Sequence, residues 1–353
     1  IKACLLLAGV TFMAFMVLAQ FGFSPEALFT QGVAVKTAIA TSGKEAAMAA
    51  AAASAAVAAT PEVALPTLNW LLSSDHELAF VITQPDRPAG RGRTLKESAI
   101  SEWARENQIE CFKPTSTSEI APLLKDIDVL LTIGYGVLLP ANLLSIPRNG
   151  CLNLHFSLLP RWRGAAPVQR AIESGDSLTG VTVFQLDPGM DTGPIYSMKR
   201  FALDGDITSD ELFQELALLG IESVEEALTA IAAGKKPQSQ TDDGATRALK
   251  ISKEECEITW NEDAQTISRK IRAFTSTPGA WTRFRGDIVK IDSVVISSES
   301  LAPGLIKVIE KELLVGTSTQ AISIGFLTPS GKSRMDARSW LNGARVNEGE
   351  NFG

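Results

Sequence analysis

Histidine is scarce in this sequence, and cysteine is sparse and unpaired. Only His76 and His155 occur among the 353 residues, and the four cysteines lie far apart without a CxxC pair. This spacing argues against a zinc module or a disulfide scaffold, and it favours a reducing compartment, which we take to be the cytoplasm. The one histidine in a polar cluster, His155, has no second nitrogen or sulfur ligand nearby in sequence, so we expect no metal site.

Positive charge is also in deficit, because 33 lysines and arginines face 40 aspartates and glutamates, for a formal net charge of −7. This balance argues against a general nucleic-acid coat, so any nucleic-acid contact needs a local basic patch. Flexible arginines suit phosphate contact. The candidates are Arg87, Arg91 and Arg93 in the Gly/Pro-rich loop 84–93, together with Arg161 and Arg163.

The first fifty residues differ in composition from the rest of the chain. Residues 4–19 form an uncharged, largely apolar run, which is short for a membrane span and closer in length to a signal-peptide core. Residues 46–59 are a low-complexity alanine tract, which favours a helix or a linker. Because the body that follows shows no sign of export, we interpret 1–52 as an atypical extension, either a buried helix or part of an upstream domain.

Apolar strands alternate with helices between residues 53 and 235, which we assign to one domain. Uninterrupted apolar strands are typical of sheets buried on both faces, so we predict an α/β fold with a mostly parallel, Rossmann-like sheet. Such sheets bind ligands beyond the carboxyl ends of their strands, and we expect the loops after residues 84, 136 and 157 to meet there. The predicted strands are 78–84, 128–136, 150–157 and 180–186, and the predicted helices are 60–77, 98–108, 166–174 and 211–234, the last with a break near Gly220 as an alternative.

The pattern changes after residue 235. Residues 236–258 are polar without an apolar period, which indicates a linker. An amphipathic helix is predicted at 263–274, followed by short strands with turns and a final helix at 333–344. This spacing predicts a small all-β barrel over residues 259–353.

The stretch NLHFSLLPRWRG, residues 153–164, carries the clearest chemical signal. In an extended strand Asn153, His155 and Ser157 face the same side, because residues two apart do. The rigid loop LDPGMDTGP adds a candidate partner, Asp191. Asn153, His155 and Asp191 together can perform acyl-type transfer without a covalent enzyme intermediate. The carboxylate orients the imidazole, the imidazole handles a proton, and the carboxamide N–H stabilises an oxyanion.

Two other chemistries fit the sequence less well. Ser157 with His155 and Asp191 contains the residue types of a hydrolase triad, but the G-x-S-x-G elbow is missing and strand neighbours are poor geometry for activating a nucleophile. The stretch GFLTPSGKS resembles a phosphate-binding loop, but it has one residue too many after Gly325 and lies among predicted β-strands. We therefore interpret it as a hairpin loop.

Five stretches, in this order, resemble the methionyl-tRNA formyltransferases, a family of folate-dependent formyltransferases. They are TQPDRPAGRGR (83–93), GYGVLLP (134–140), NLHFSLLPRWRGAAPVQRAI (153–172), GDSLTGVTVFQLDPGMDTGPI (175–195) and IRAFTSTPGAW (271–281). The resemblance covers about residues 60–345 and is most specific over 150–195.

The resemblance implies an activity and a set of roles. The formyl donor would be 10-formyltetrahydrofolate, and the acceptor would be the α-amino group of methionine on initiator tRNA. No DNA and no stable protein partner are implied. Asn153, His155 and Asp191 match the catalytic trio of the family, and Ser157, Leu158, Leu159 and Pro160 match its folate-contacting turn. The loop with Arg91 matches a segment that contacts the tRNA acceptor stem, and the C-terminal barrel would be an OB-like module that binds the tRNA.

Two departures from the family leave alternatives open. Phe156 stands where the family usually has a small residue, which would tighten the pocket. The first strand of the family falls on ASAAVAAT, residues 53–60, and alanine is a poor strand former. Either a weak strand forms at 54–59, or residues 32–41 replace it, or the strand is missing and the chain is an inactive binding relic. A formyltransferase acting on a small amine, such as an amino sugar, is the other alternative.

Overall fold

The alanine-rich segment does form a strand, and it lies inside the main sheet. The computed structural model describes residues 53–89 and 94–353. Strand β1 (Ser54–Ala59) pairs in parallel with β2 (Glu77–Ile82) on one side and with β6 (Val129–Ile133) on the other. Residues 55–59 are at most 1% exposed. Hydrogen bonding on both sides and full burial outweigh the weak intrinsic propensity of alanine. The missing-strand alternative is therefore wrong, whereas residues 32–41 lie outside the described part.

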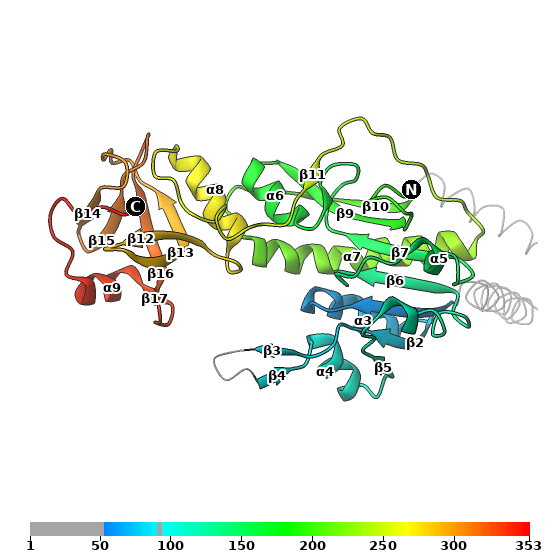
Figure 1. Cartoon of the computed structure of the whole chain (residues 1–353). Coiled ribbons are helices and arrows are strands. Elements are labelled where there is room, and N and C mark those ends of the chain that lie inside the picture. Colours follow the sequence, from blue (N-terminus) through cyan, green and yellow to red (C-terminus); the bar gives the residue numbers. More distant parts are fainter. Residues whose placement is uncertain (1–52, 90–93) are drawn as a thin grey trace, which may run out of the picture. The chain divides into compact units, whose positions relative to one another are not determined.

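The sheet has seven strands in the order β10-β9-β7-β6-β1-β2-β5 (Figure 1). Strands β5, β2, β1, β6 and β7 are parallel, and β9 and β10 are antiparallel to their neighbours. The prediction of a mostly parallel α/β sheet is confirmed. The bounds not yet given are β5 (Cys111–Phe112), β7 (Cys151–His155), β9 (Leu178–Gln185) and β10 (Ile195–Ala202).

The predicted helices form, and the longest one is continuous. Helix α7 (Ser209–Ala232) begins with a capping box between Thr208 and Glu211 and packs against β9 and β10. Gly220 does not break the helix. The absence of a side chain at Gly220 lets the helix lie close to the sheet. A Cβ at this position would lie 2.7 Å from Leu154. The other helices of this domain are η1 (Glu62–Ala64), α3 (Leu65–Ser73), α4 (Ala99–Glu106), η2 (Thr117–Glu119), α5 (Ala141–Leu144) and α6 (Pro167–Ser174).

The C-terminal part is an antiparallel sheet flanked by two helices. Its strand order is β12-β13-β16-β15-β14, with β17 paired to β16, so the ladder is open between β12 and β14. Trp260, Phe284, Trp340 and Phe352 pack together in its core. The elements are α8 (Ala264–Phe274), β12 (Ala280–Phe284), β13 (Asp287–Ile296), β14 (Ile306–Ile309), β15 (Glu312–Val315), β16 (Ile322–Pro329), β17 (Met335–Asp336) and α9 (Ala337–Ala344). GFLTPSGKS covers the end of β16 and the turn into β17, as the hairpin interpretation predicted.

The polar stretch between the two sheets forms backbone pairs with the N-terminal domain. Within it, β11 (Arg247–Ala248) pairs in parallel with the short strand β8 (Arg163–Gly164), and Gln238 bridges to Ile195. No local pattern predicts this pairing, because a two-residue strand has no detectable period. A separate two-stranded antiparallel pair consists of β3 (Arg87–Ala89) and β4 (Thr94–Lys96).

The apolar run 4–19 and the tract up to residue 52 lie outside the described residues. In residues 53–89 and 94–353, we find no helix with the length and apolar character needed to cross a membrane.

Candidate active site

A cavity of about 1300 Å³ opens over the carboxyl ends of β1, β6 and β7. Its wall includes the residues that follow each of these strands, such as Pro61, Gly134 and Phe156. The expectation that loops after neighbouring strands meet in one crevice therefore holds for the loops after β6 and β7. The loop after residue 84 contributes none of its described residues 85–89 to the wall. It touches the site through Gln84, whose Nε2 donates to the Tyr135 carbonyl at 2.6 Å.

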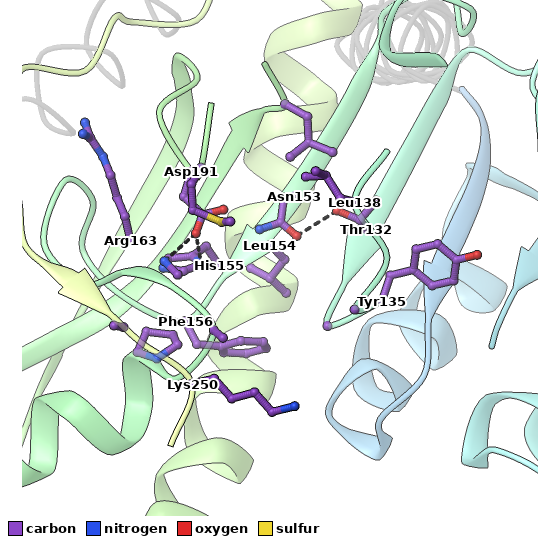
Figure 2. Close-up of a pocket in the computed structure, with 18 of the residues that line it drawn as sticks. Thr132, Tyr135, Leu138, Asn153, Leu154, His155, Phe156, Arg163, Asp191 and Lys250 are labelled. Atoms are coloured by element: carbon purple, nitrogen blue, oxygen red, sulfur yellow. Dashed lines mark hydrogen bonds and ion pairs between the residues drawn. The ribbon is translucent and has the colours of Figure 1, made fainter. Parts of the chain in front are cut away.

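Asn153, in the middle of β7, has its carboxamide fixed from the neighbouring strand. The hydroxyl of Thr132 on β6 donates to Asn153 Oδ1 at 2.8 Å (Figure 2). Both residues line the cavity. Because the oxygen is already engaged, the Nδ2 amide of Asn153 is the group that faces the cavity, and it can donate to a ligand oxygen.

His155 ends β7, and a backbone carbonyl fixes the protonation of its ring. Nε2 lies 2.9 Å from the Trp162 carbonyl oxygen. A carbonyl can only accept, so Nε2 carries a proton and donates it. In the neutral imidazole, Nδ1 is then unprotonated and available as a base. Trp162 has φ 64, in the left-handed region that few non-glycine residues adopt, and this conformation contributes to directing its carbonyl toward the ring.

Asp191 reaches His155 from a different segment. Strand β9 runs antiparallel to β7, so its end lies beside Leu152, and the loop 186–194 must fold back along β7 to reach His155. Asp191 Oδ2 lies 3.8 Å from His155 Nδ1 and accepts a hydrogen bond of 2.7 Å from the Gly164 N–H. Asn153, His155 and Asp191 therefore meet in the one cavity, although their catalytic roles stay predictions.

Burial sets the charge state of His155. The side chain is nearly fully buried, and this burial lowers the pKa of the imidazole below its ordinary value of 6.5. The Asp191 carboxylate and the Trp162 carbonyl act in the opposite direction, because they stabilise the imidazolium. The net direction is downward, so the imidazole is neutral at pH 7 and can accept a proton at Nδ1.

The predicted folate-contacting turn does not line this cavity. The Ser157 hydroxyl donates to the Arg161 carbonyl at 2.6 Å, and Ser157 and Leu159 are buried. Ser157 is thereby committed to holding the turn, which excludes it as the nucleophile of a triad with His155. Contact of Ser157, Leu158, Leu159 and Pro160 with folate stays a prediction.

Two of the five arginines predicted for tRNA are already paired. Arg161 forms a two-pronged ion pair with Asp176, at 2.8 and 2.5 Å, and Trp162 Nε1 donates to the same carboxylate at 2.8 Å. Arg163 donates to Asp242 at 2.9 Å and to Gln240, and its side chain is 12% exposed. These pairings compensate part of the charge that phosphate contact would use, and contact of Arg161 and Arg163 with tRNA stays a prediction.

The other three predicted arginines belong to the loop after β2. Arg87 is exposed on β3 and donates to Gln84. Arg91 and Arg93 lie outside the described residues. For all three, contact with tRNA stays a prediction.

Two supporting residues were not predicted from the sequence pattern. Thr132 lies in an uninterrupted apolar run, and its hydroxyl gives no signal until β6 is placed beside β7. Gly164 is one glycine in a loop, but it has φ +127, and a Cβ there would lie 2.5 Å from the Ala248 carbonyl oxygen. For Gly164, the only signal in the sequence is its place in a turn bounded by proline and glycine directly after the Asn-x-His strand.

We expect Gly164→Ala to lower kcat by about ten- to a hundredfold without unfolding the protein, because misplaced catalytic groups cost rate steeply. The added methyl group must push β11 away or shift the N–H that binds Asp191. Steady-state kinetics and thermal unfolding measure the two effects. Gly205→Ala is the matched control, because a methyl group added there would meet no atom within 4 Å. A kcat within about twofold of wild type would contradict this role of Gly164.

Comparisons with known proteins assign both parts of the chain to a family. The formyl transferase family model matches residues 55–228, and the model of the formyl transferase C-terminal domain matches residues 250–345. A methionyl-tRNA formyltransferase from Thermobifida fusca is 41% identical over 303 residues, which are 84% of this chain and 98% of that protein. One from Mycobacteroides abscessus is 41% identical over 297 residues, covering 82% of this chain and 96% of that protein.

Solved structures share the fold at low sequence identity. HypX from Aquifex aeolicus, in complex with tetrahydrofolic acid, aligns with a TM-score of 0.62 at 17% identity, over 85% of this chain and 48% of that one. An N-formyltransferase from Helicobacter canadensis, in complex with folinic acid and dTDP-3-aminofucose, aligns with a TM-score of 0.59 at 18% identity, over 76% of this chain and 98% of that one. Both domain matches and two relatives at 41% identity lead to one assignment: the chain belongs to the methionyl-tRNA formyltransferase family.

Proposed function

We propose that this enzyme transfers the formyl group of 10-formyltetrahydrofolate to the α-amino group of methionyl initiator tRNA, with Asn153, His155 and Asp191 as the catalytic residues. One observation carries the proposal. The Nδ2 donor of Asn153 and the unprotonated Nδ1 of His155 face the same cavity. The Thr132 hydroxyl donates to Asn153 Oδ1, and His155 Nε2 donates to the Trp162 carbonyl.

In this mechanism the amine attacks the formyl carbon directly. A C–N bond forms, and the carbonyl electron pair moves to the formyl oxygen, where the Asn153 amide donates a hydrogen bond. His155 Nδ1 takes the proton that the amine releases, and the resulting imidazolium lies between the Asp191 carboxylate and the Trp162 carbonyl. As the tetrahedral species collapses, the bond from carbon to N10 of the folate breaks. His155 returns the proton to N10, so the enzyme ends unchanged.

The cavity wall suits a flat donor with an apolar face. Leu138 and Met190 line it and are 75% and 59% exposed, so both apolar side chains are accessible to a ligand in the cavity. Figure 2 shows Leu138 on the same side of the site as Asn153 and Thr132. We place the pterin of the donor against this apolar wall.

The choice of acceptor rests on the family relatives and on charge. The amino-sugar alternative derives from distant relatives such as the Helicobacter canadensis enzyme, whereas the 41% identical relatives are methionyl-tRNA formyltransferases. Arg247 and Lys250, both exposed, are two cations on the cavity wall that phosphate can reach, although Glu62, Asp187 and Asp210 also line it.

The test compares two acceptors with 10-formyltetrahydrofolate as donor. We expect formylation of methionyl initiator tRNA and no measurable formylation of a dTDP-amino sugar. The KM for tRNA should rise with salt concentration, because phosphate contacts release counterions, and Arg87→Ala should reduce the salt slope by about one phosphate contact. Preferential formylation of the sugar, or a KM for tRNA that is independent of salt, would contradict the proposed acceptor.

A further inference from the structure

The segment 240–248, which connects the two sheets, touches Asp191 of the proposed catalytic trio and the backbone of Trp162, and its residues 245–248 also line the cavity. Gln240 Nε2 donates to the carbonyl of Asp191 at 3.0 Å and to the carbonyl of Gly193 at 2.6 Å. The Asp191 backbone has φ 54, a conformation that surrounding contacts must stabilise. Gln240 therefore supports the loop that delivers Asp191.

The same segment supports His155 through the backbone of Trp162. The Thr246 hydroxyl accepts from the Trp162 N–H at 2.9 Å, and the Thr246 carbonyl accepts from the Arg163 N–H at 2.9 Å. The Arg163 N–H and the Trp162 carbonyl belong to one planar peptide group. Fixing that N–H therefore fixes the direction of the carbonyl to which His155 Nε2 donates.

A third contact joins this segment to the loop that contains Gly164. The Ala165 N–H donates to the Ala248 carbonyl at 2.7 Å, which holds β11 against β8 and keeps the Gly164 N–H directed at Asp191. Gln240 Oε1 also accepts from Arg163 at 2.9 Å. Both partners of the imidazole thus depend on one segment that comes more than eighty residues after His155.

We propose that Gln240 and Thr246 are positioning residues for formyl transfer, which act by holding Asp191 and the Trp162 carbonyl against the His155 imidazole. This proposal rests on the proposed function, in which His155 is the base. It assigns the connecting segment a part in catalysis that is separate from joining two domains.

The variants are Gln240→Leu and Thr246→Val, which keep side-chain volume and remove hydrogen-bonding groups. We expect kcat to fall about tenfold in Gln240→Leu, because a displaced supporting shell costs rate on this scale. Thr246→Val should lose less, because its backbone carbonyl still accepts from Arg163. Thr246→Ser should restore wild-type kcat. Gln238→Leu is the matched control, because its side chain is exposed and its backbone pairs with Ile195.

The pH titration of His155 distinguishes a positioning role of these residues from a merely structural one. The chain has two histidines, so NMR of the untagged, histidine-labelled protein gives two titrating rings, and His76→Ala assigns them. Asp191 and the Trp162 carbonyl raise the pKa of His155 against its burial. Loosening either one should make His155 titrate at lower pH than in wild type. The cavity wall also carries the charged side chains of Glu62, Arg163, Asp187, Asp210, Arg247 and Lys250, which the variants leave in place.

A lower kcat, a lower titration midpoint for His155 and rescue by Thr246→Ser support the inference. An unchanged His155 titration in both variants would overturn it, even if kcat fell, because the loss would then come from folding or substrate binding. His155→Ala tests the proposed function separately. If that variant is inactive while Gln240→Leu and Thr246→Val behave as wild type, only the inference about the connecting segment fails.

Discussion

Replacing His155 with alanine is expected to lower kcat for formyl transfer by about a thousandfold, within the range of general acid–base catalysis. In the proposed mechanism, the variant lacks the base that takes the amine proton and the acid that returns it to N10. Binding of the folate donor should change little, because the cavity keeps its apolar wall. Rapid-quench formation of formylmethionyl-tRNA measures the chemical step, and equilibrium titration with a folate analogue measures binding.

The control for this variant is the other histidine. His76 lies next to the amino end of β2, at the opposite edge of the sheet, where its Nδ1 accepts from the Ala53 N–H at 3.2 Å. His76→Ala should retain wild-type kcat and lose about 1 kcal/mol of stability, the usual contribution of one hydrogen bond. If His155→Ala kept most of the activity while remaining folded, the assignment of the base would be wrong.

The pH dependence of the rates of wild type and His155→Ala tests the direction of the His155 pKa shift. Burial lowers the pKa of His155, so the neutral, active base persists at mildly acidic pH and is lost only when pH falls below that lowered pKa. The substrate amine titrates in both enzymes. The ratio of wild-type to His155→Ala rates should therefore be constant near neutrality and decline toward low pH. A ratio that rises as pH falls would contradict a neutral His155 as the base.

The second large effect is expected for Asn153→Ala, with kcat reduced by about a hundredfold to a thousandfold and KM for both substrates nearly unchanged. In the proposed mechanism, the carboxamide acts when charge develops on the formyl oxygen, so its loss should raise the barrier more than it weakens ground-state binding. Comparing kcat and KM in the same assay separates the two effects.

Two further variants sharpen this prediction. Asn142→Ala, at an exposed position on α5, is the matched control and should behave as wild type. Thr132→Val leaves Asn153 in place but removes the hydroxyl that orients it, so we expect an intermediate loss of about tenfold in kcat. A large rise in KM with unchanged kcat in Asn153→Ala would instead make Asn153 a binding residue.

Much of the site was predictable because its signals are local. Asn153 and His155 alternate along one strand, and a strand places residues two apart on one side wherever it lies in the sheet. The Pro/Gly-rich loop around Asp191 indicated a fixed turn in the same way. The apolar runs of β6, β7 and β9 indicated burial on both faces, and hence the layered α/β fold.

Other features depended on partners that no local pattern shows. The β1 alanines form a strand because β2 and β6 satisfy their backbone on both sides, which outweighs propensity. Arg161 and Arg163 have no evident partner nearby in sequence, yet Asp176 and Asp242 neutralise them. The two-residue strands β8 and β11 have no detectable period at all.

The sequence by itself determined which groups the proposed mechanism can use, namely a carboxamide, an imidazole and a carboxylate in two segments. Only the tertiary structure decided which atoms of those groups face the cavity. Thr132 engages the amide oxygen, the Trp162 carbonyl takes the Nε2 proton, and the segment containing Gln240 holds Asp191 in place. The physical reason is that a hydrogen bond depends on distance and direction in space, and strand register sets both between residues that are far apart in the chain.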